Sequence, residues 1–81
     1  MSQIFPLKVG DCFRTKNDQI RRITAIENGL VNYEQRGSKS HMPWAPGPNK
    51  SSLPTEAKFR EQVKERVRCD WDADHHNQPP V

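Results

Sequence analysis

The sequence predicts a small α+β domain in which a curled antiparallel meander of three or four strands packs against one C-terminal helix. Strand-like segments separated by turn residues come first, a loop rich in serine and proline follows, and a helical pattern comes last. The chain has 81 residues, of which 32% are hydrophobic, so it can form one thin core and not two domains. We expect one domain over residues 1–69 and a disordered acidic tail over residues 70–81.

The first three strands are predicted more clearly by the turn residues between them than by the side-chain pattern within them. We expect strands over residues 9–16, 19–27 and 30–36. Asn28-Gly29 separates the last two, and this pair favours the two-residue type I′ hairpin turn, which needs positive φ at both positions. Counting outward from that turn pairs Glu27 with Leu30, Ile26 with Val31, Ala25 with Asn32 and Thr24 with Tyr33.

The spacing of three isoleucines predicts an irregularity in the second strand. Ile20, Ile23 and Ile26 lie three residues apart, and strand alternation cannot place all three on one face. A β-bulge, or a strongly coiled strand that is apolar on both faces, accounts for this spacing. We expect the core to contain these isoleucines together with Val9, Phe13, Val31, Tyr33, Phe59, Val63 and Val67.

A loop and a helix are predicted after the meander. Residues 38–54 contain four prolines, four serines and one glycine, which is typical of a loop. A fourth strand, if present, falls within residues 39–45. Thr55 is a favourable N-cap for a helix over residues 55–68, and apolar side chains then recur every four residues. This apolar stripe is one side chain wide, so the helix can close one face of a sheet.

The start of the chain resembles a known class of small domain. Val9-Gly10-Asp11, a basic strand, a tight turn and the Asn28-Gly29 hairpin resemble the opening of SH3-like small barrels, which are found in Tudor, KOW-type and uncharacterised bacterial and phage proteins. The resemblance covers residues 7–36. It implies an SH3-like fold and a nucleic-acid or peptide ligand.

The distribution of charge favours an anionic partner. The net charge of +3 is composed of about +6 on the predicted domain and −3 on the tail, and basic surfaces of this kind bind phosphates. Arg21 and Arg22 are adjacent, so they project to opposite sides of a strand. The candidate nucleic-acid-binding residues are Arg14, Lys16, Arg21, Arg22, Arg36 and Lys39.

Two aromatic side chains leave alternatives open. Tyr33 and Trp44 could stack against bases beside the basic surface, as in single-strand binders, or could fill the core. We expect a small non-enzymatic protein that binds nucleic acid. The alternative is a protein-interaction module, or a host-modulating accessory module, in which the stiff proline-rich loop presents Met42 and Trp44 to a protein partner.

The sequence predicts no enzyme, cofactor or small-molecule substrate. Its three histidines and two cysteines form no hydrolase, phosphate-loop or metalloprotease motif. Cys12 with His41 as nucleophile and base is an alternative, but a cysteine within a strand is more often a core residue. His75 and His76 predict only weak adventitious binding of zinc or nickel, because no scaffold fixes them.

The cysteines and the apolar content predict the compartment. Cys12 and Cys69 have no CxxC partner, and no secretory signal precedes them. We therefore expect two reduced thiols in a cytoplasmic protein. No apolar run approaches the length of a bilayer span, so no membrane partner is expected.

Overall fold

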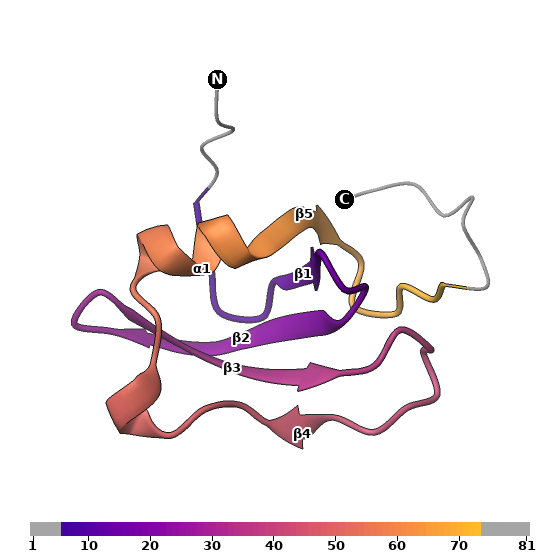
Figure 1. Cartoon of the computed structure of the whole chain (residues 1–81), viewed down its shortest axis with the longest axis horizontal. Coiled ribbons are helices and arrows are strands. Elements are labelled where there is room, and N and C mark those ends of the chain that lie inside the picture. The colour runs from indigo at the N-terminus through magenta and orange to yellow at the C-terminus, as the bar shows by residue number, and fades with distance from the viewer. Residues whose placement is uncertain (1–5, 74–81) are drawn as a thin grey trace.

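Five antiparallel strands and one short α-helix make up residues 6–73, the part of the chain that the computed structural model describes (Figure 1). The strands are β1 (Cys12–Thr15), β2 (Ile20–Glu27), β3 (Leu30–Arg36), β4 (Ala45–Pro46) and β5 (Val63–Val67). The helices are a 3-10 helix, η1 (Lys50–Ser52), and α1 (Glu56–Gln62). The predicted α+β class is confirmed.

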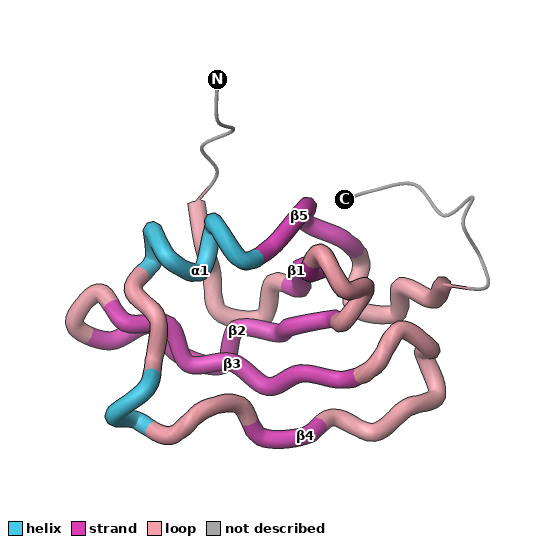
Figure 2. The backbone as a smooth tube through the Cα atoms, in the orientation of Figure 1, coloured by secondary structure: helices cyan, strands magenta, loops and turns pink. Residues whose placement is uncertain are grey.

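The sheet is open. Its strand order is β4-β3-β2-β1-β5, so β4 and β5 are two separate edges that do not meet (Figure 2). The sheet is therefore neither closed nor curled, and the prediction of a curled meander of three or four strands is wrong in both respects. The two-residue β4 lies at the end of the segment predicted to hold a fourth strand, and β5 is a fifth that the sequence did not predict.

The hairpin between β2 and β3 turns at Asn28-Gly29, as predicted, with φ angles of 54° and 76°. Three of the predicted pairs are confirmed: Glu27 with Leu30, Ile26 with Val31, and Ala25 with Asn32. The fourth is wrong, because the register shifts between Ile23 and Ala25 and pairs Ile23 with Tyr33. This shift is the irregularity that the isoleucine spacing predicts, and it leaves Thr24 exposed as the extra residue.

The segment predicted as one helix over residues 55–68 forms a short helix followed by a strand, so the prediction is confirmed only for its first half. Thr55 is the N-cap as predicted, and its side chain accepts a hydrogen bond from the backbone N–H of Lys58 at 3.1 Å. α1 ends at Gln62, and the chain continues directly as β5 along the outer edge of β1 (Figure 1). β1 has unpaired backbone groups on that side, which a strand can satisfy and a helix cannot.

One face of the sheet, the helix-covered face, carries the larger apolar cluster. Its buried members are Leu7, Phe13, Ile23, Val31, Phe59 and Val63, with Ile26 and Tyr33 partly buried against them. Phe59 comes from α1, and its ring lies 5.6 Å from that of Phe13 in an edge-to-face arrangement. The predicted docking of the helix through Phe59 is confirmed.

The opposite face, the disulfide face, carries a smaller cluster. Cys12, Ile20 and Val67 are buried there, with Trp44, Cys69 and Trp71 packed against them. Val67 lies on this face although Val63 lies on the other, because the pairing of β5 with β1 shifts register between Arg14 and Thr15. Val9 is 63% exposed and is not a core residue; it lies in a turn with Gly10, whose φ is 95°, before β1 begins.

Cys12 and Cys69 form a disulfide across 57 residues. The prediction of two reduced thiols is therefore wrong, and Cys12 has no free thiol with which to act as a nucleophile beside His41. Disulfides are typical of oxidising compartments, whereas the cytoplasmic location stays a prediction from the sequence. Within residues 6–73, no helix is long and apolar enough to cross a bilayer.

Candidate functional site

Arg36 is a structural residue of the disulfide face. It is only 4% exposed, and its guanidinium donates hydrogen bonds to four backbone carbonyls. The acceptors are the carbonyl oxygens of Gly37 and Lys39, at 3.0 Å each, Cys69 at 2.8 Å and Trp71 at 2.7 Å. Burial lowers the pKa of Arg36, and the nearby charge of Asp72 opposes that shift. A phosphate cannot reach this side chain while the four carbonyls surround it.

Arg22 is also occupied within the fold. Its guanidinium pairs with the carboxylate of Glu34, the side chain directly opposite on β3. It also lies 4.2 Å from the centre of the Trp44 ring, and Arg36 lies 5.2 Å from the same ring. Trp44 is thus half-buried against two arginines and the smaller apolar cluster, which supports the structural alternative for this residue.

Arg14 has two carboxylate partners. Its guanidinium reaches Glu65 on β5 and Asp18 in the turn after β1, both at 2.6 Å, and it lies 5.4 Å from the Trp71 ring centre. Desolvation alone lowers the pKa of Arg14, but the hydrogen bonds to Glu65 and Asp18 outweigh it, so the net shift is upward. The charge of Arg14 is therefore neutralised within the protein.

The structure does not bring the predicted basic residues together on one surface. Arg14, Arg22 and Arg36 share the disulfide face, where each is engaged internally. Lys16 is exposed just after β1, and Lys39 is half-buried in the loop after β3. Arg21 lies on the helix-covered face, so the prediction that Arg21 and Arg22 project to opposite sides is confirmed.

Arg21 differs from the other arginines of β1 to β3 in its partners. Its guanidinium lies 4.5 Å from the centre of the Tyr33 ring and donates hydrogen bonds to the side-chain oxygens of Gln62 at 2.7 Å and Gln35 at 3.3 Å. Among residues 6–73 it has no carboxylate partner. Burial lowers the pKa of Arg21, and Tyr33 offsets part of that shift. The result is a half-buried cation whose charge is paired with no acidic side chain of the described residues 6–73.

A surface pocket of about 520 Å³ lies next to the surroundings of Arg21, although Arg21 itself does not line it. Two of the side chains that contact Arg21, Tyr33 and Gln62, also line the pocket. The remaining lining residues are Pro48, Ser52, Leu53, Pro54, Thr55 and Lys58. Apolar walls therefore meet hydroxyl and amide groups and the cation of Lys58, a combination that suits a ligand with a flat apolar part and an anionic part.

Gly47 shapes one wall of this pocket. A Cβ atom built on Gly47 would collide with the backbone carbonyl of Tyr33. Only glycine lets the chain after β4 pass so close to β3, and this passage brings Pro48 to the pocket. The proline-rich loop thus contributes to a pocket, which its composition alone did not indicate.

Arg21 and Tyr33 are candidates from the sequence, whereas no sequence pattern indicates Gln35, Lys58 or Gln62. Strand alternation already places Gln35 opposite Arg21 once the β2–β3 register is known. Lys58 and Gln62 are one helical turn apart on α1. Only the docking of α1 brings Gln62 to Arg21 and places both helix residues at the pocket that Tyr33 also lines.

The remaining predicted candidates lie elsewhere. Met42 is 39% exposed and packs against Gly37 in the loop before β4, while His41 is exposed beside it. Within the described part of the chain no group of three His, Cys, Asp or Glu side chains could hold a metal ion. His75 and His76 lie outside the described residues, so their adventitious metal binding stays a prediction.

Comparison of the chain with protein-family models, with curated proteins and with solved structures finds no match.

Proposed function

We propose that this protein binds single-stranded nucleic acid, without catalysis, in the pocket beside Arg21. The observation that carries the proposal is the half-buried guanidinium of Arg21, which has no carboxylate partner in residues 6–73 and whose contacts Tyr33 and Gln62 line a pocket of about 520 Å³. An uncompensated cation beside apolar walls favours a ligand that combines phosphate with a planar base.

The pocket offers each part of a nucleotide a matching group. Leu53, Pro54 and the Tyr33 ring provide apolar contact for a base. Lys58, whose side chain is 62% exposed, provides positive charge for a phosphate at the pocket. Arg21 adds positive charge from behind the lining, through its contacts with Tyr33 and Gln62. A single strand fits this arrangement better than a duplex, because an unpaired base can turn away from its neighbours into a pocket.

The sequence gives the proposal independent support. The predicted domain carries a net positive charge, and the resemblance of residues 7–36 to SH3-like modules implies a nucleic-acid or peptide ligand. That resemblance stays a prediction, as does the absence of any cofactor.

Fluorescence anisotropy with a labelled oligothymidylate at low ionic strength tests the proposal. Arg21→Gln should weaken binding about tenfold, which corresponds to about 1.4 kcal/mol. Arg22→Gln is the matched control, because it removes the same charge from the neighbouring position of β2 on the opposite face. We expect it to change the affinity little, and circular dichroism should show both variants folded.

A second pair of variants tests the site independently in case Arg21→Gln does not fold. Lys58 and Lys64 are both exposed, and only Lys58 lines the pocket. Lys58→Gln should weaken binding more than Lys64→Gln. Equal effects within both pairs would indicate diffuse electrostatic attraction and contradict the site, and an oligonucleotide that does not bind at low salt would contradict the function.

The protein-interaction alternative has one supporting observation, the exposure of Met42 next to the short edge strand β4. Trp44 does not add to it, because it is packed against Arg22 and Arg36. Capture of partners with the full chain, with and without nuclease treatment, distinguishes the two: partners lost on nuclease treatment support nucleic-acid binding, and partners retained support the alternative.

A further inference from the structure

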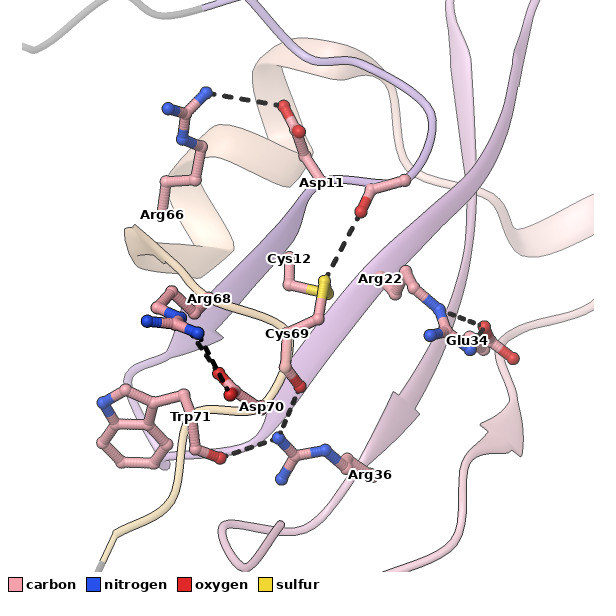
Figure 3. Close-up of a disulfide and its surroundings, with 11 residues drawn as sticks. Asp11, Cys12, Arg22, Glu34, Arg36, Arg66, Arg68, Cys69, Asp70 and Trp71 are labelled. Carbon is pink, nitrogen blue, oxygen red and sulfur yellow. Dashed lines mark hydrogen bonds and ion pairs between the residues drawn. A yellow bond between two sulfur atoms is a disulfide. The ribbon is translucent and has the colours of Figure 1, made fainter. Parts of the chain in front are cut away.

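A C-terminal segment, residues 68–73, lies across the disulfide face and is held there by one covalent bond and several hydrogen bonds; we call it the clasp (Figure 3). Arg36 donates to the carbonyl oxygens of Cys69 and Trp71. Asp72 accepts from the backbone N–H of Ser40 at 2.8 Å and from its hydroxyl at 2.7 Å. The clasp follows β5, so it can move without disrupting any strand of the sheet.

The two halves of the disulfide differ in accessibility. Cys12 is 1% exposed within β1, whereas Cys69 is half-buried in the clasp. Both cysteines line a surface depression of about 430 Å³, together with Gly10, Asp11, Arg66, Val67, Arg68 and Asp70. A small molecule in this depression can therefore reach the sulfur of Cys69 more readily than that of Cys12.

The charges around the depression come in two pairs of opposite sign. Arg68 lies 3.3 Å from Asp70, and Arg66 lies 3.7 Å from Asp11. Figure 3 shows one pair on each side of the disulfide. Asp11 has a buried carboxylate oxygen with no hydrogen-bond partner in residues 6–73. The side chains of Arg68 and Asp70 are 56% and 59% exposed, unlike that of Arg14, so this pair can exchange its partners for a ligand that carries both carboxylate and ammonium groups.

We propose that Cys69 is a site of thiol–disulfide exchange with a small zwitterionic thiol of the glutathione type. The thiolate of the small molecule attacks the Cys69 sulfur and forms a mixed disulfide there, and the Cys12 sulfur leaves as a thiolate that takes a proton from water. A second small thiolate then attacks the small molecule's sulfur in the mixed disulfide. Cys69 is released and protonated, and the two small thiols leave as their own disulfide.

Reoxidation of the reduced protein can form only one disulfide within the chain. The chain contains two cysteines, so reoxidation can restore only the Cys12–Cys69 bond within one molecule. Reduction leaves the clasp attached by non-covalent contacts, which include the hydrogen bonds of Arg36 and Asp72, the hydrogen bond from the Ala73 N–H to the Ser38 carbonyl, and the packing of Trp71. We therefore expect it to open more often. Opening separates Trp71 from Arg14, which gives the reaction an optical signal.

Equilibration of the full chain in glutathione buffers tests the proposal. We expect reversible reduction with the sheet intact by circular dichroism, and a red shift of Trp71 emission in a Trp44→Phe background. Acid quenching and peptide mapping should find glutathione on Cys69. A disulfide that resists glutathione in the folded protein but is reduced in urea would show a purely structural bond and overturn the proposal, as would glutathione found on Cys12.

Single-cysteine variants measure the accessibility directly. With oxidised glutathione, Cys12→Ser should be modified on Cys69 about tenfold faster than Cys69→Ser is modified on Cys12, because a buried thiol reacts slowly. Equal rates would contradict the assignment. If either variant fails to fold, the peptide mapping on the native chain decides which sulfur is attacked.

The charge recognition has its own test. Arg68→Gln should slow reduction by glutathione about threefold and leave reduction by uncharged 2-mercaptoethanol unchanged. Lys50→Gln, on η1 after β4, removes the same charge away from the depression and should affect neither rate. An equal effect of Arg68→Gln on both thiols, or no effect on either, would overturn the preference for a zwitterionic thiol.

Discussion

On the helix-covered face, Phe59 of α1 packs edge-to-face against Phe13 and closes a cluster of six buried apolar side chains. On the disulfide face, only three buried residues form the cluster, and the clasp is held over it by the Cys12–Cys69 bond and the hydrogen bonds of Arg36. The first face is stabilised mainly by burial of apolar surface, which does not depend on direction. The second depends on directional polar contacts and one cross-link.

This difference reflects the small size of the domain. A chain of this length buries too little apolar surface to build two full cores. A disulfide and an arginine that donates four hydrogen bonds let the second face close with little apolar area. They also make that face responsive to its chemical surroundings, since a disulfide can be reduced and an apolar cluster cannot.

The largest effect is expected from the helix-covered face. Phe59→Ala should lower the free energy of unfolding by about 4 kcal/mol, because it removes the ring at the centre of the cluster and leaves a cavity. Urea denaturation followed by circular dichroism measures it. Val9→Ala is the control: Val9 is 63% exposed, so the change should stay within about 0.5 kcal/mol. Comparable losses in both variants would contradict the assignment of Val9 to a surface turn.

The disulfide should rank second. Cys12→Ala combined with Cys69→Ala should cost about 3 kcal/mol, because the bond closes a long loop and restricts the unfolded chain. Urea denaturation of the double variant gives the loss, and the native chain in excess reductant should show the same stability. If reductant leaves the urea midpoint of the native chain unchanged, the disulfide face is held by its polar contacts alone.

Removal of the arginine network should rank third. Arg36→Leu leaves four carbonyl oxygens without their donor and should cost about 2 kcal/mol. Arg22→Leu on the same face is the matched control. Its guanidinium has one carboxylate partner and its side chain is 35% exposed, so the loss should be about 1 kcal/mol or less. Thermal unfolding of both variants in parallel tests the order, and a larger loss for Arg22→Leu would refute it.

The smallest effect is expected at the start of α1. Thr55→Ala removes the side-chain acceptor for the backbone N–H of Lys58 and should cost about 1 kcal/mol. Thr24→Ala, at the exposed bulge residue of β2, serves as the control with an expected change near zero. Comparison of the urea midpoints shows whether the Thr55 cap stabilises α1. If the two threonine variants are equally stable, α1 is held by the packing of Phe59 alone.

Local residue chemistry determined a large part of the fold. Asn28-Gly29 defined the hairpin and its first three residue pairs, the isoleucine spacing predicted the bulge, and Thr55 marked the start of α1. The hairpin pairs and the N-cap depend on residues close to one another in the chain. For such features, turn geometry, side-chain alternation and capping hydrogen bonds act before distant segments meet.

Contacts between distant residues decided the rest. Val63–Val67 fits a helix by its own spacing, and the unpaired edge of β1 makes it a strand. Cys12 and Cys69 are 57 residues apart, and their pairing depends on where β5 ends relative to β1. Likewise, Arg21 and Arg22 are adjacent residues of the same type, and the sequence does not distinguish them. Arg21 lies under α1, where it contacts the side-chain amide of Gln62. Arg22 lies on the other face, where Glu34 neutralises its charge and Trp44 covers it. A sequence pattern predicts the face of the sheet on which a side chain projects, because that depends on local alternation. The partners of that side chain depend on how the whole sheet and α1 pack.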